Sequence, residues 1–156
     1  MPTVEVSFTA LPAHVRTARL VALAVARRAG VDDQILDEVR LAVGEACSRA
    51  VSLHHVKAPG RPVIMRLIDE QDRFIVEVVD CGSFEDAVGA AEVELIPETL
   101  APDSDGVDVL PDPLPPGFGL AVISGLVEDF EVGAEVRGTR VRMTWPASDV
   151  MAPEVR

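Results

Sequence analysis

Four short segments of the chain carry residue types that can bind or react. Glu45 and Arg49 stand four residues apart in a stretch with helical apolar spacing, and Asp80 and Gly82 come just after the mostly apolar run Phe74–Val79. A carboxylate can accept hydrogen bonds or a proton, and a glycine lets another group approach the backbone closely. Two further glycine-containing segments contribute the candidates Gly117, Gly119, Leu120 and Thr139. Each segment alone also has a structural explanation, as a solvated helix face, a turn, a flexible helix entry or a hairpin.

Apolar periodicity predicts the elements that carry these segments. We expect a helix that begins at Asp32 or Asp33, which are favourable N-caps, and runs to Leu53 with Glu45 and Arg49 on it. Gly30 is the expected C-terminal cap of the helix before it. The other expected helices are Val15–Ala29 and Leu120–Leu126, and the expected strands are Val4–Phe8, Val63–Ile68, Phe74–Val79, Phe130–Val136 and Thr139–Trp145.

This element order predicts an α+β fold. Adjacent strands joined by short links form hairpins, so a mostly antiparallel, mixed sheet covered on one face by helices is expected, as a two-layer sandwich. We expect one domain over residues 1–146 and a flexible tail over 147–156. Ser83–Pro116 has nine acidic residues, no basic residue and six of the twelve prolines. That composition predicts either a mobile lid or a solvated acidic linker with no role.

Together and in this order, the four segments resemble the nucleotide-binding (Bergerat-type) fold of the GHKL superfamily. More narrowly, they resemble the anti-sigma-factor serine kinases of bacterial partner switching. The resemblance covers the chain from about Val4 to Trp145, and its most specific part is Glu-Ala-Cys combined with Asp-x-Gly, Gly-x-Gly-Leu and Gly-Thr. It implies a protein that binds ATP with Mg²⁺, sequesters a sigma factor and phosphorylates a serine of a STAS-type anti-sigma-factor antagonist. It also leaves room for a homodimer.

The resemblance implies a role for each candidate residue. Asp80 would accept a hydrogen bond from the adenine amino group, Gly82 would let the backbone approach the base, and Thr139 would hold the adenine edge through its hydroxyl. Glu45 would orient or deprotonate the serine hydroxyl. The residues implied at the phosphates, where helix-opening amides favour anions, are Gly117, Gly119 and Leu120.

Arg49 departs from the family pattern, which has an asparagine at this position that helps to hold Mg²⁺. A guanidinium carries no acceptor lone pair, so Arg49 cannot replace an oxygen ligand and a Mg²⁺ site is doubtful. Arg49 lies one helical turn from Glu45 and can pair with it, or it can contact a phosphate directly. The family role as an active kinase therefore has an alternative, a partner-switching binding module with weak or absent kinase activity.

Composition excludes several other classes of function. The net charge of −12 argues against nucleic-acid and anionic-membrane partners, and no apolar run reaches the roughly 18 residues of a membrane span. With no signal-peptide pattern, we expect a cytoplasmic protein. Cys47 and Cys81 lack metal or redox spacing and are expected to be small buried thiols. No other metal cluster is apparent, and His54 and His55 are expected at a helix end, as caps or on the surface.

Overall fold

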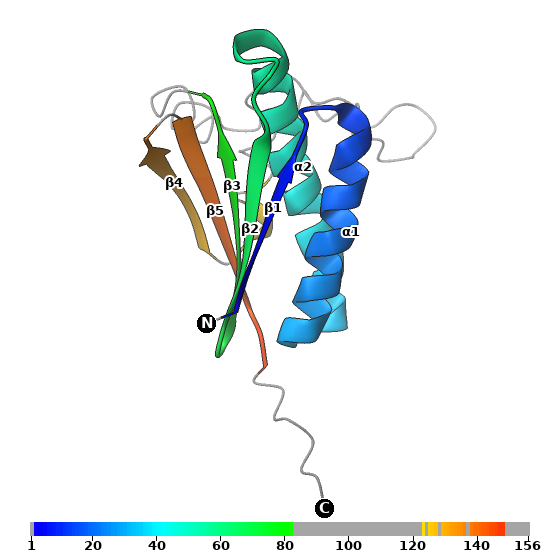
Figure 1. Ribbon diagram of the computed structural model, residues 1–156. Helices are drawn as coiled ribbons and strands as arrows, with labels where there is room; N and C mark the ends of the chain where they lie inside the picture. The colour runs from blue at the N-terminus through cyan, green and yellow to red at the C-terminus, as the bar shows by residue number, and fades with distance from the viewer. Residues whose placement is uncertain (1, 83–122, 124, 128, 137, 149–156) are drawn as a thin grey trace, which may run out of the picture.

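The computed structural model describes residues 2–82, 123, 125–127, 129–136 and 138–148, which form two helices and a five-stranded sheet. In chain order the elements are β1 (Thr3–Phe8), α1 (Pro12–Ala29), α2 (Asp33–Lys57), β2 (Val63–Glu70), β3 (Arg73–Asp80), β4 (Asp129–Glu135) and β5 (Gly138–Pro146). The strand order is β1-β2-β3-β5-β4, and every pairing among these strands is antiparallel. Both helices lie on the same face of the sheet (Figure 1). The α+β two-layer prediction is confirmed.

Local sequence signals determine where the two helices begin and end. Pro12 occupies the first turn of α1, where its missing N–H costs no hydrogen bond. Gly30 ends that helix in the left-handed conformation, at φ 89°, as its sequence position predicts. Asp32 caps α2 by accepting a hydrogen bond from the Gln34 N–H at 2.8 Å. The short link between these two caps lets α2 return antiparallel beside α1.

The core lies between the helix layer and one face of the sheet. Side chains alternate along each strand, so those two residues apart share a face. In β5 the side chains of Thr139, Val141, Met143 and Trp145 are all buried, and the alternation predicted for this strand is confirmed. Register pairs Val141 with Val78 and Thr139 with Asp80, so this face continues from the apolar core to the polar end of β3.

The opposite face of the sheet carries a row of alternating charges. One register level crosses all five strands and contains Glu5, Arg66, Glu77, Arg142 and Glu131. Glu77 lies in the middle, with its side chain only 7% exposed, and accepts from Arg142 at 3.1 Å and from Arg66 at 3.5 Å. The hydrogen bond to Glu5, with help from Glu135 and Glu77, raises the pKa of Arg66. The row satisfies charges on a face that the two helices leave uncovered.

Several expected features fall outside the described residues. They are the acidic segment 83–116, Gly117, Gly119 and Leu120, most of the helix expected over 120–126, and all but the first two residues of the C-terminal tail. Of that third helix, Ile123, Gly125 and Leu126 are described and helical, and Ile123 is fully buried in the core. None of the helices described is long and apolar enough to cross a membrane.

Candidate functional site

Asp80 and Thr139 form a polar corner under the helix layer. Asp80 ends β3, Thr139 follows the first residue of β5, and the two are register partners. Both side chains share the face of the sheet that holds Val78 and Val141, so they point toward the helices. The Asp80 side chain is 1% exposed, and Thr139 is fully buried. A carboxylate this deep requires partners for both of its oxygens.

The backbone of Gly82 connects the two side chains of this corner. Its N–H donates to Asp80 Oδ1 at 2.6 Å, and the Thr139 hydroxyl donates to its carbonyl oxygen at 2.7 Å. A Cβ at Gly82 would lie 2.8 Å from Asp80 Oδ1 and 3.1 Å from Leu53, which leaves no room for a side chain. A Cβ at Gly138 would overlap the carbonyl oxygen of Asp80. The two glycines are therefore required by close approach of neighbouring groups.

Arg49 provides the second partner of the Asp80 carboxylate. Its guanidinium reaches from α2 and donates to Asp80 Oδ2 at 2.5 Å, with side-chain exposures of 9% for Arg49 and 1% for Asp80. The sequence left Glu45 and a phosphate open as partners of Arg49, but the ion pair formed is with a third group. The ion pair joins Arg49, which departs from the family pattern, to Asp80, which is expected to bind adenine. A base can bind Asp80 only by sharing the carboxylate with Arg49 or displacing it.

Glu45 lies on α2 one turn before Arg49, and it is half-buried and makes interactions of its own. Cys47, between them in sequence, faces the core, where burial raises the pKa of its thiol to about 12. The thiol therefore stays protonated at neutral pH. The expectation of a buried thiol is confirmed for Cys47, whereas Cys81 is partly exposed. No group of three metal-binding side chains occurs among the residues described, and Arg49 supplies no oxygen.

His54 corrects one expectation from the sequence. It was expected, with His55, to cap the helix or lie on the surface, but His54 is only 2% exposed whereas His55 is exposed. The signal was present, because His54 continues the spacing of Cys47, Ala50 and Val51 along the buried face of α2. Its Nδ1 lies 2.8 Å from the Arg61 carbonyl oxygen, and its Nε2 lies 3.1 Å from the Cys81 nitrogen. His54 therefore contacts the turn that holds Asp80 and Gly82.

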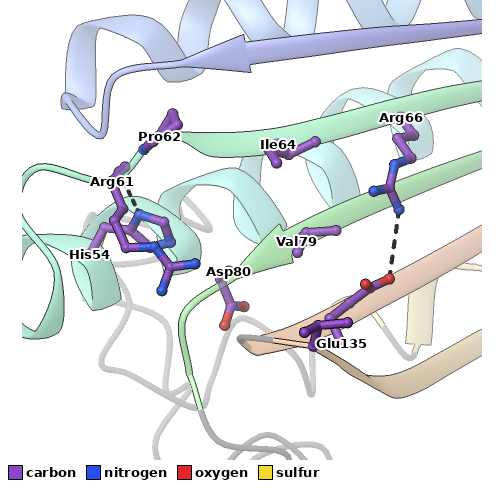
Figure 2. A pocket seen from close by; sticks show the side chains of 9 residues that line it. His54, Arg61, Pro62, Ile64, Arg66, Val79, Asp80 and Glu135 are labelled. Atoms are coloured by element: carbon purple, nitrogen blue, oxygen red, sulfur yellow. Dashed lines mark hydrogen bonds and ion pairs between the residues drawn. The ribbon is translucent and has the colours of Figure 1, made fainter.

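A pocket of about 300 Å³ lies beside this corner, and Figure 2 shows His54 and Asp80 among its lining residues. Its floor includes Ile64 and Val79, which are register partners on the face of the sheet turned away from the helices. The side chains of Asp80 and Thr139 belong to the opposite face. We therefore do not assign this pocket to the base that Asp80 would bind.

A histidine kinase-like ATPase domain model matches residues 8–145, which span the helix layer, the sheet and the Asp80–Thr139 corner. The chain belongs to the histidine kinase-like ATPase family. The match includes all the candidate residues from Glu45 to Thr139, and it agrees with the resemblance derived from their order.

Two relatives show more narrowly which proteins this chain resembles. The chain is 32% identical over 145 residues to the serine-protein kinase RsbW of Bacillus pumilus (strain SAFR-032), covering 90% of this chain and 83% of that protein. Its fold is similar to the crystal structure of the RsbU and RsbW domains of Rv1364c from Mycobacterium tuberculosis, with a TM-score of 0.59 and 16% identity. That alignment covers 97% of this chain and 35% of the longer protein, and at this identity it supports the fold alone.

Proposed function

We propose that this protein is an ATP-dependent regulator of the anti-sigma-factor type, which sequesters a sigma factor and phosphorylates a serine of an anti-sigma-factor antagonist. The similarity to the serine-protein kinase RsbW over nine-tenths of the chain supports the reaction class. The observation that carries the proposal in this molecule is the Asp80–Gly82–Thr139 corner, held in the matched ATPase domain. Sigma factors act in the cytoplasm, and we infer that this protein acts there too.

The described residues fit the base of ATP at this corner. Each carboxylate oxygen of Asp80 has two acceptor positions, so Asp80 can accept from an adenine amino group while it keeps the Gly82 N–H. Asp80, Leu53 and Arg49 fill the space beside Gly82, so a flat ring can approach this turn only where Arg49 moves aside. Thr139 orients the turn by donating to the Gly82 carbonyl. We assign Asp80, Gly82 and Thr139 to base recognition.

The reaction end of the site rests on Glu45 and Arg49. Bound ATP supplies the phosphoryl group, and Glu45 orients the serine hydroxyl of the antagonist and accepts its proton. Arg49 does not fit a magnesium site because its guanidinium has no lone pair to give. If adenine displaces it from Asp80, its charge becomes available to the phosphates, together with the backbone amides of Gly117 and Gly119 and with Leu120.

The test is transfer of labelled γ-phosphate from ATP to a purified STAS-type antagonist protein. We expect transfer by the wild type and a loss of roughly 10²–10⁴-fold in Glu45→Gln, because the general base is removed. Glu38→Gln, an exposed glutamate on the same helix, is the matched control and should transfer at the wild-type rate.

One outcome of this assay would contradict kinase activity, and two others would define the role of Arg49. A wild type that binds ATP without transferring phosphate is a partner-switching binding module. A rate that rises in Arg49→Asn would identify the arginine as the cause of a weakened site, since asparagine restores an oxygen ligand. A robust wild-type rate that collapses in Arg49→Asn instead supports the phosphate role of Arg49.

A further inference from the structure

His54 is a buried polar side chain whose two ring nitrogens both have backbone partners. It lies in the last turn of α2, and its hydrogen bonds reach the Arg61 carbonyl, just before β2, and the Cys81 N–H, just after β3. The end of α2, the turn before β2 and the segment after β3 therefore meet at one imidazole. In Figure 2, His54 and Arg61 lie close together at one end of the pocket, with Asp80 nearby.

The partners determine the protonation state of this ring. A carbonyl oxygen only accepts, so Nδ1 carries the hydrogen and donates to Arg61 at 2.8 Å. An amide N–H only donates, so Nε2 accepts from Cys81 at 3.1 Å. Only the neutral tautomer with its hydrogen on Nδ1 satisfies both contacts.

The Cys81 amide lies between the two residues that face the proposed base. Asp80 is held by Arg49 and by the Gly82 N–H, and the Gly82 carbonyl is held by Thr139. His54 supplies the partner of the remaining amide in this turn. Without an acceptor at Nε2, the Cys81 N–H would be left without this bond, and the peptide that orients Asp80 and Gly82 would be free to rotate.

We propose that His54 is a positioning residue for the nucleotide site, acting through its Nε2 acceptor on the Asp80–Gly82 turn. This inference rests on the proposed function, because its effect is on nucleotide affinity. His54 is not a ligand of the nucleotide. It holds a backbone amide so that the carboxylate and the glycine present the geometry that a base requires.

Two isosteric substitutions separate positioning from general stability. In His54→Gln the side-chain amide reaches the place of Nε2, so its oxygen can still accept from Cys81. In His54→Asn the shorter amide reaches the place of Nδ1, so it can donate to Arg61 but leaves Cys81 without a partner. Each variant loses one of two hydrogen bonds, so both should lose similar amounts of stability in urea unfolding.

The experiment is calorimetric titration of each full-length variant with ATP, together with amide exchange of Cys81 measured by NMR. We expect His54→Asn to bind ATP roughly tenfold more weakly than wild type, with fast Cys81 exchange, and His54→Gln to stay within about threefold. Equal affinities in both variants, or wild-type affinity in His54→Asn, would overturn the positioning role while leaving ATP binding intact. A wild type that does not bind ATP overturns the proposed function, and the positioning role with it.

Discussion

At the scale of single residues, Arg49 and Asp80 determine what the site can do. The carboxylate is almost fully buried, and its charge is balanced by a guanidinium that is itself nearly buried. Removing one partner of such a pair leaves an uncompensated charge, which costs more than removing both. Arg49, which departs from the family pattern, is therefore energetically coupled to Asp80, the residue proposed to bind the base.

A double-mutant cycle measures this coupling. Arg49→Met should lower the free energy of unfolding by about 3–5 kcal/mol, because Asp80 is left buried and charged. Adding Asp80→Asn should recover at least about 1 kcal/mol of that loss, since the asparagine oxygen still accepts from the Gly82 N–H. Urea unfolding measures both. Arg40→Met, which breaks an exposed pair with Asp37, should change stability by less than about 0.5 kcal/mol. Additive losses in the double variant would contradict a coupled pair.

Cys47 predicts a pH dependence at high pH. Burial raises its pKa from the ordinary value of 9.0 to about 12, so the folded protein holds the thiol proton more tightly than the unfolded chain does. The contribution of the protonated thiol to the free energy of unfolding is fully present below pH 9. It is lost as the pH rises toward 12, at up to about 1.4 kcal/mol per pH unit. Unfolding at pH 8 and pH 10 should show a larger drop for wild type than for Cys47→Ala. An equal drop in the two proteins would mean that Cys47 ionises as easily in the folded state.

At the scale of elements, different interactions stabilise the two faces of the sheet. The helix-facing side is apolar and packs the core, while the other side uses the charge row that crosses the strands at Glu77. Two arginines converge on this one buried carboxylate. Cross-strand pairs of opposite charge stabilise sheets, and a central, shielded position strengthens them.

Replacement of the central carboxylate tests the row. Glu77→Gln should destabilise the protein by roughly 1–3 kcal/mol, because Arg66 and Arg142 lose a charged acceptor in a poorly hydrated place. Glu131→Gln is the matched control, since Glu131 stands at the same register level on the exposed edge strand. Thermal unfolding of both variants at low and high salt gives the comparison. If Glu77→Gln loses no more stability than Glu131→Gln does, the charge row contributes little to the stability of the sheet.

The elements themselves were largely predictable from the sequence. Caps such as Asp32 and Gly30 and the alternation in β5 are local signals, and local signals determined the helices and hairpins. The pairing of Arg49 with Asp80 and that of His54 with Cys81 were not predictable, because these partners lie 31 and 27 residues away in the chain. Those contacts depend on how α2 crosses the end of β3, which no sequence period encodes. The strand order, with β5 between β3 and β4, is equally a product of tertiary packing.

At the scale of the whole molecule, the fold brings one helix and two strand ends to a single polar corner. Arg49 and His54 come from α2, which also carries Glu45 one turn before Arg49, and Asp80 and Thr139 come from neighbouring strands of the sheet. The matched ATPase domain spans all of them. The central claim is that this corner binds the base of ATP through Asp80.

Calorimetric titration of the full-length protein with ATP, with and without Mg²⁺, tests that claim most directly. We predict binding by wild type, little gain from Mg²⁺ because Arg49 offers no oxygen ligand, and affinity at least roughly tenfold weaker in Asp80→Asn, which loses a charge-assisted hydrogen bond. Asp72→Asn, an exposed carboxylate in the turn between β2 and β3, is the control and should bind as wild type does. Absence of ATP binding by the wild type, or unchanged affinity in a folded Asp80→Asn variant, would contradict it.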